Sequence, residues 1–122
     1  MEQLWRNPAL GVASVGFHMR HMAGSVDRLT TYLRGQPLTE EQLATLRLEH
    51  EAGASFAVLL EAVEGEFQKT EAVVRGIAVS SYQDLRGVGR RQLPTTVGGL
   101  IVHISEHTQR HLGQAVLTSK FV

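Results

Sequence analysis

The stretch that decides the fold is residues 103–111, HISEHTQRH, in which His103, His107 and His111 follow one another at intervals of four residues. On an α-helix, residues four apart lie one above the other, offset by about 40° around the axis. The three imidazoles are therefore expected to line one side of a helix. Two histidines at i, i+4 can share a divalent ion, but residues eight apart are separated by a rise of roughly 12 Å. The spacing allows His103 with His107, or His107 with His111, on one ion; a polar stripe beside the core is the alternative.

The composition limits the class of protein. The 122 residues suit one compact domain, which we expect to span 1–122, and 12 basic side chains balance 12 acidic ones. This balance argues against nucleic acid as a partner. No apolar run reaches the ~18–20 residues that cross a bilayer, and the first residues form no apolar signal segment, so we expect a cytoplasmic protein with no membrane contact. The chain has no cysteine, so a metal would be held by histidine, carboxylate or water, as is typical of borderline divalent ions.

Apolar residues at helical spacing predict three long helices and one short helix. The first long helix should cover about 13–34, with an apolar seam of Val15, Met19, Met22, Val26, Leu29 and Leu33. The second should cover about 53–75, with a seam of Phe56, Leu60, Val63, Phe67 and Val74 and with Thr70 filling one gap. The third should begin after Thr95 or Thr96 and run to about residue 119.

The rest of the chain reads as connections and one short helix. Thr39-Glu40-Glu41-Gln42 is a capping-box sequence, which predicts a short helix over about 39–50. Residues 82–94 are rich in glycine and arginine and lack periodicity, so we expect a connection there. Strand-like alternation is absent. The predicted fold class is all-α, an up-down bundle of three long helices and a short one.

A third metal ligand can come from the first long helix, which carries His18 and His21. His18 lies about 60° from the middle of the apolar seam and His21 about 120° from it, so the angular argument favours His18. His50, between Glu49 and Glu51, is expected to be a solvated surface residue. Periodicity alone leaves the choice between His18 and His21 open.

Residues 14–29 and 103–114 resemble the DinB-like superfamily, whose members are four-helix bundles with a three-histidine metal site. The family pattern of histidine, a large apolar residue and alanine matches residues 21–23, His-Met-Ala. The closing pattern, two histidines at i, i+4 followed by x-Gly-Gln, matches His107 and His111 before residues 112–114.

The resemblance implies that His21, His107 and His111 bind a divalent ion, which we expect to be zinc or nickel. It leaves His18 and His103 beside this site, where they would line the pocket or hydrogen-bond a ligand. Gln114 lies three residues past His111 on the same helix face and would hydrogen-bond a ligand. The motif thus selects His21 where the angular argument favours His18, and we follow the motif because its match is residue by residue.

The resemblance also implies a function. Family activities are the transfer of low-molecular-weight thiols and thiol-dependent isomerisation, and metal-dependent hydrolysis is proposed. We therefore expect a metal-dependent thiol S-transferase or hydrolase acting on a small molecule, with the thiol as co-substrate. The alternative is a non-catalytic, metal-stabilised dimer that serves in stress response or interaction. Family members carry a further helix before the segment where this sequence begins, so we expect the chain to lack the first family helix and to form a homodimer.

Other polar residues give weaker signals. Arg90, Arg91 and Arg110 are candidates for contact with an anionic substrate. Glu106 is rotated about 100° from His107 on a helix and is expected to point away from the ion. Residues 87–91, Gly-Val-Gly-Arg-Arg, resemble a phosphate loop only in part, because the Walker lysine and a preceding strand are missing. No catalytic residue beyond the metal ligands is indicated.

Overall fold

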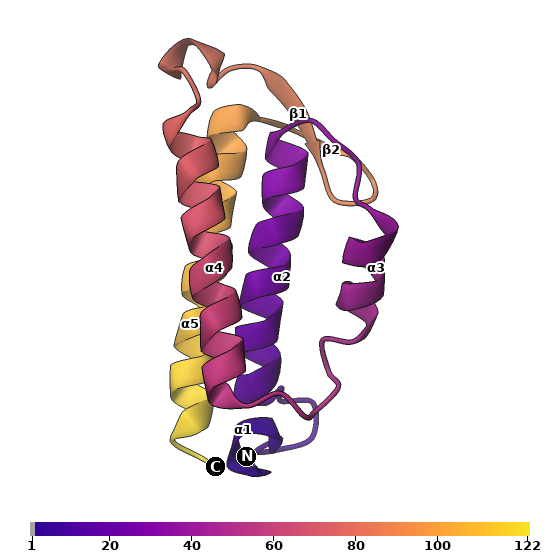
Figure 1. Ribbon diagram of the computed structural model, residues 1–122, viewed down its shortest axis with the longest axis vertical. Coiled ribbons are helices and arrows are strands. Elements are labelled where there is room, and N and C mark those ends of the chain that lie inside the picture. Colours follow the sequence, from indigo (N-terminus) through magenta and orange to yellow (C-terminus); the bar gives the residue numbers. More distant parts are fainter. Residues whose placement is uncertain (1) are drawn as a thin grey trace.

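A computed structural model describes residues 2–122; Met1, which falls in the predicted domain 1–122, lies outside them (Figure 1). The described elements are helices α1 (Glu2–Trp5), α2 (Val15–Leu33), α3 (Glu40–Arg47), α4 (Phe56–Arg75) and α5 (Val97–Ser119), a 3-10 turn (Val79–Ser81), and strands β1 (Leu85–Val88) and β2 (Leu93–Thr96). The predicted all-α class is confirmed, with three long helices and a short α3.

Side-chain hydroxyls set where the helices begin. The Oγ of Ser14 accepts a hydrogen bond from the backbone N–H of Phe17 at 3.1 Å, and Thr39 forms the predicted capping box that starts α3. Thr96 caps α5 in the same way. Helix α2 ends at Leu33, and Gly35 follows with φ +73°, a left-handed conformation that suits glycine. These local signals explain why the predicted helices begin and end close to the observed residues.

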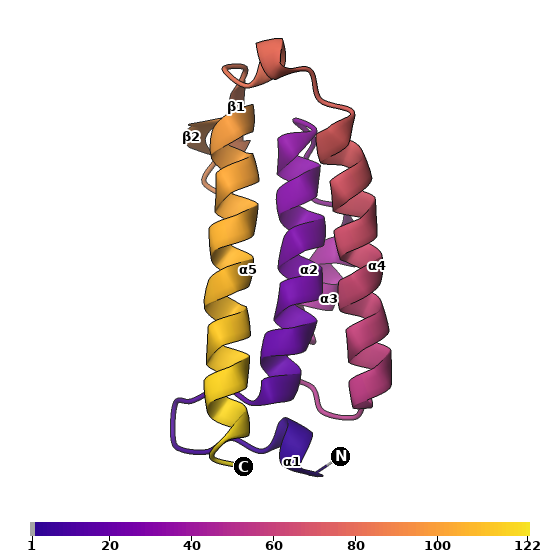
Figure 2. The same cartoon turned by 90° about the vertical axis from the view of Figure 1, so that its left-hand side faces the viewer.

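Helix α2 is the centre of the bundle. Figure 1 shows α2 and α4 running in one direction and α5 in the other, while the segment with α3 returns along the side of α2. Figure 2 shows α2 between α5 and α4. Within residues 2–122, α2 packs on both of these helices, which hardly contact each other. The buried core therefore follows the two sides of α2.

Two apolar clusters fill these two contacts. Towards one end, Val26 and Leu29 pack with Leu100 and Ile104 of α5, and towards the other end Met19 and Met22 pack with Leu59 and Val63 of α4. The predicted seam of α2 is buried, except for the half-buried Val15. This seam holds α5, and with it the histidine stripe, at a fixed rotation against α2.

Helix α4 differs from the sequence prediction. Leu59, Val63 and Thr70 are buried, whereas Phe56, Leu60 and Phe67 are 55%, 38% and 40% exposed. Val63 and Thr70 of the predicted seam thus lie on the contact line and Val74 packs against the core, whereas the other three members lie at the flank. The physical reason is that α4 carries a wide apolar face but packs on α2 alone among the long helices.

The hairpin of β1 and β2 was not predicted, because residues 82–94 were interpreted as a plain connection. The strands pair antiparallel, from Leu85 with Thr96 to Val88 with Leu93. Each strand has four residues, and Gly87 and Pro94 interrupt them, so no alternation was detectable. Arg86 Nε donates to the carbonyl of Leu33 at 2.8 Å, which fixes the hairpin over the end of α2. In the described part of the chain, no helix is long and apolar enough to cross a membrane.

Candidate metal centre

Three histidines from two helices meet on one side of the α2–α5 contact. One ring nitrogen from each of His21, His107 and His111 lies within 4.8 Å of the others. The ring centroids are 4.4 Å apart for His21 and His111, 4.6 Å for His107 and His111, and 5.1 Å for His21 and His107. The i, i+4 spacing supplies two rings on α5, and the packing of α2 brings in the third. These are the residues that the family motif selected.

The geometry of the facing nitrogens fits a divalent ion. Nε2 of His21 and Nε2 of His107 lie 3.1 Å apart. Two lone pairs at this distance repel unless a proton or a cation lies between them. Two nitrogens bound to one tetrahedral zinc at about 2.0–2.1 Å are roughly 3.3 Å apart, close to the observed separation. Three imidazoles without a thiolate are a donor set that suits zinc, nickel or copper.

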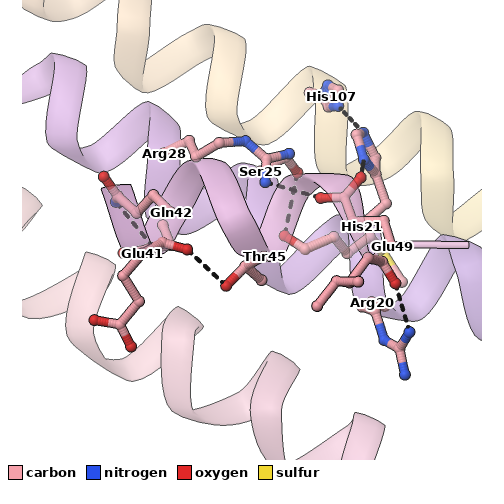
Figure 3. A network of polar contacts seen from close by, with 12 residues as sticks. Arg20, His21, Ser25, Arg28, Glu41, Gln42, Thr45, Glu49 and His107 are labelled. Atoms are coloured by element: carbon pink, nitrogen blue, oxygen red, sulfur yellow. Dashed lines mark hydrogen bonds and ion pairs between the residues drawn. The ribbon is translucent and has the colours of Figure 1, made fainter. Parts of the chain in front are cut away.

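A buried carboxylate orients His21. Nδ1–H of His21 donates to Oε2 of Glu49 at 2.6 Å, and Oε1 of Glu49 pairs with Nη1 of Arg28 at 2.8 Å (Figure 3). Because the proton of His21 is held on Nδ1, the lone pair on Nε2 is free to point at the other histidines. A carboxylate behind a histidine ligand is a common arrangement in metal sites, where it fixes the ring and raises its basicity.

The role of this carboxylate was not predicted from the sequence. Glu49 follows the end of α3 and is separated from Glu51 by His50, for which a solvated surface position was expected. In the structure Glu49 is 3% exposed, while His50 is exposed and stacks on Phe17 with centroids 4.2 Å apart. No local pattern separates Glu49 from Glu51, because the contact with His21 is 28 residues distant along the chain.

The protonation states suit metal binding. Burial, together with the nearby His21, lowers the pKa of His107 and of His111 to about 4, so both rings are neutral near pH 7 and keep a free lone pair. For Glu49, burial alone would raise the pKa, but the hydrogen bond from His21 and the charge of Arg28 outweigh burial and hold this pKa below its usual value. The two α5 histidines of the site are therefore neutral and Glu49 is ionised.

His18 lies directly behind His111. It is 5% exposed, and its Nδ1 is 3.1 Å from Nδ1 of His111. Burial, then the nearby His21, lowers the pKa of His18, so it is neutral and can accept the Nδ1 proton of His111. Accepting this proton would direct Nε2 of His111 towards the other two rings. His18 thus contacts a member of the cluster without being part of it.

A cavity of about 360 Å³ borders the histidine cluster. His21, His103 and His107 form part of its wall, and Arg28 and Arg90 also line it. The apolar part of the lining comes from α2, α3, the segment before it and the hairpin: Leu29, Leu38, Leu46, Val88 and Leu93. This volume accommodates a small molecule beside His21 and His107.

The remaining predicted residues lie outside the cluster. His103 is exposed and stacks on His107 with centroids 6.1 Å apart. Arg91, Arg110 and Gln114 are exposed and do not line this cavity, although Arg110 and His107 border a second hollow on α5. Glu106 is also exposed, as expected for a side chain rotated away from the cluster. Of the three candidate arginines, only Arg90 lines the cavity beside His21.

Comparison with known proteins identifies the family. The sequence model of the DinB superfamily matches residues 1–115. This chain belongs to the DinB superfamily. The match covers α2, with His21, and α5 through both His107 and His111, so the membership inferred from the histidine motifs is confirmed. No match was found among curated proteins or among solved structures.

Proposed function

We propose that this protein is a divalent-metal-dependent enzyme that transfers a low-molecular-weight thiol to a small electrophilic substrate. The observation that supports it most is the position of His21 and His107, whose Nε2 atoms lie 3.1 Å apart and which both line a cavity of about 360 Å³. A site closed on all sides by protein ligands would favour a structural ion, whereas a three-histidine cluster with two members lining a cavity leaves positions for a substrate.

The residues of the chain have distinct roles in this proposal. His21, His107 and His111 would hold the ion, which we expect to be zinc or nickel, and Glu49 and His18 would orient two of these rings. A divalent ion on three neutral imidazoles keeps its double charge and supplies Lewis acidity that stabilises a thiolate. The apolar lining by Leu29, Leu38 and other residues suits an apolar part of the substrate, and the charge of Arg90 suits an anionic group on it.

The net reaction would join the thiol sulfur to the electrophile. A thiol R–SH and an electrophile R′–X give R–S–R′, with the thiol proton and the leaving group X departing together. The chain has no cysteine, so the reacting sulfur belongs to the co-substrate. Hydrolysis, with water in place of the thiol, is the related reaction that the same site would support.

The test is a thiol-consumption assay on the zinc-loaded protein, with several small thiols and alkyl halide electrophiles. We expect consumption that stops on treatment with a chelator, returns when zinc is restored, and is lost in His107→Ala but kept in His50→Ala. Consumption that is equal with and without metal would contradict the proposal. Turnover of an ester or amide with no thiol present would instead indicate the hydrolase.

A specific observation favours a second candidate, a non-catalytic dimeric protein stabilised by its metal. Large apolar side chains remain exposed on the flanks of α4 and α5, among them Phe67, Leu112 and Val116 at 40%, 47% and 52%. Apolar surface of this kind commonly marks an association surface. We propose a homodimer through these flanks in either case; the thiol assay separates the enzyme from the purely structural dimer.

A further inference from the structure

Polar contacts hold the segment from Leu38 to Glu51 on the bundle at both ends, and Leu38 packs against the core between α2 and α5. The helix of the segment, α3, has no buried residue. At the first end, the amide of Gln42 donates to Oδ2 of Asp27 at 2.9 Å and to Oγ1 of Thr31 at 2.8 Å. At the far end, Nη1 of Arg20 donates to the carbonyl of Leu48 at 2.8 Å and to that of Glu51. Both outer anchors are at the surface or partly buried, where hydrogen bonds compete with water.

Glu49 is the buried anchor of this segment. Its side chain is 4% exposed, and each carboxylate oxygen has one cationic or polar partner, Arg28 on one side and His21 on the other. Helix α2 leaves space for it, since a Cβ at Gly24 would lie 2.8 Å from both Nη1 of Arg28 and Oε1 of Glu49. A carboxylate is buried at a large desolvation cost unless such partners compensate it. The bundle therefore contains a specific buried binding site for one side chain of the segment, that of Glu49.

We propose that Glu49 is the positioning residue of the metal centre and couples metal binding to the docking of residues 38–51 on α2. This inference rests on the metal site of the proposed function. A cation held by His21 would withdraw electron density from the ring and strengthen the charge-assisted hydrogen bond from Nδ1–H to Glu49. The docked carboxylate in turn makes His21 a better ligand. Because such coupling is reciprocal, docking raises metal affinity by the factor by which metal favours docking.

The proposed coupling between metal binding and docking of the segment also involves the cavity. Leu38 and Leu46, which lie within the same segment, line the cavity together with His21 and His107. Docking of the segment thus completes the apolar wall beside the ion. Metal loading and formation of the substrate cavity would be one linked event rather than two.

The experiment combines zinc affinity with hydrogen–deuterium exchange. Zinc affinity is measured by competition with a chromophoric chelator, and amide exchange over residues 38–51 is followed with and without saturating zinc. The variants are Glu49→Gln, which keeps the size and removes the charge, and the control Gln42→Ala, which removes an anchor that does not contact His21. The visible spectrum of the cobalt-substituted proteins reports the ligand field directly.

We expect zinc to slow exchange over 38–51 in the wild type. In Glu49→Gln, zinc affinity should fall about 10- to 100-fold, the cobalt spectrum should shift, and saturating zinc should no longer slow exchange. Gln42→Ala should exchange faster without metal but retain the zinc-dependent slowing and the wild-type cobalt spectrum.

Two results would overturn the coupling while leaving the metal centre intact. One is a wild-type protein that binds zinc while amide exchange over residues 38–51 stays unchanged. This result does not depend on whether any variant folds. The other is a folded Glu49→Gln with wild-type zinc affinity. A wild type that binds no zinc would overturn the metal centre as well, and the two failures are therefore distinguishable.

Discussion

At the scale of single residues, His18 shows how a side chain outside the cluster controls one inside it. Its Nδ1 lies 3.1 Å from Nδ1 of His111. We expect His18→Ala to weaken zinc binding roughly 10-fold, because His111 loses the partner that fixes its proton on Nδ1. His18→Gln, whose amide oxygen can accept the same hydrogen bond, should recover part of the loss. Competition with a chelator measures both, and unchanged affinity in His18→Ala would mean that packing alone holds the ring of His111.

Gly24 provides a second residue-scale test. A Cβ at this position would meet Nη1 of Arg28 and Oε1 of Glu49, each at 2.8 Å, whereas a Cβ at Gly65 of α4 meets nothing within 4 Å. Gly24→Ala should therefore displace the ion pair and lower zinc affinity several-fold. Gly65→Ala should leave zinc affinity unchanged and raise the free energy of unfolding by about 0.5–1 kcal/mol, through helix propensity. Equal zinc affinity in the two variants would contradict the role assigned to the space at Gly24.

The residue scale also shows what the sequence could predict about the site. His18 lies nearer the core than His21, as its angle to the apolar seam predicted, since His18 is 5% exposed and His21 is half-buried. That angle favoured His18 as the third ligand, whereas the ring that clusters with His107 and His111 is that of His21, because the histidines meet at the flank of α2, next to the cavity, and not at the middle of its apolar seam. The motif selected His21 directly. The role of Glu49 could not be predicted from the sequence, because it depends on how the segment after α3 folds back on α2.

At the scale of elements, α4 offers a test of its rotation. Leu59 is 3% exposed and Leu60 38%, although the sequence pattern had placed Leu60 on the inward seam. Leu59→Ala should lower the free energy of unfolding by about 2–4 kcal/mol through loss of burial and the cavity left behind. Leu60→Ala should cost less than about 1 kcal/mol. Urea unfolding in a monomeric background, such as the Phe67→Glu variant below, measures both without a contribution from association. The reverse order of costs would show that α4 is rotated differently.

Predictability differed between elements for physical reasons. Helices α2, α3 and α5 were located well because each begins at a hydroxyl cap, Ser14, Thr39 or Thr96, and the sequence displays such caps locally. The hairpin was missed because its strands are short and owe their position to Arg86 on the end of α2. The rotation of α4 was misjudged because its apolar face is wider than its single contact, so periodicity does not determine which line packs inward.

At the scale of the whole molecule, the uncovered flank of α4 predicts association. Phe67 and Val58 are both exposed, at 40% and 56%, and they lie nine residues apart, roughly 180° around the helix. Phe67 shares its side of α4 with Phe56 and Leu60, whereas Val58 does not. In light scattering we expect twice the chain mass for the wild type and for Val58→Glu, and the monomer mass for Phe67→Glu. A monomeric wild type would contradict the homodimer, and a dimeric Phe67→Glu would place the interface elsewhere.

The central claim is that His21, His107 and His111 together hold one divalent ion, and its most direct test is the metal content of the purified protein. Mass spectrometry measures this metal content in the wild type and in four alanine variants, at His21, His107, His111 and the exposed His50. We expect about one zinc or nickel ion per chain in the wild type and in His50→Ala, since a three-histidine site takes a single ion, and loss of that ion in each of the other three variants. No bound ion in the wild type after loading with zinc and with nickel, or full retention in His21→Ala, would contradict the claim.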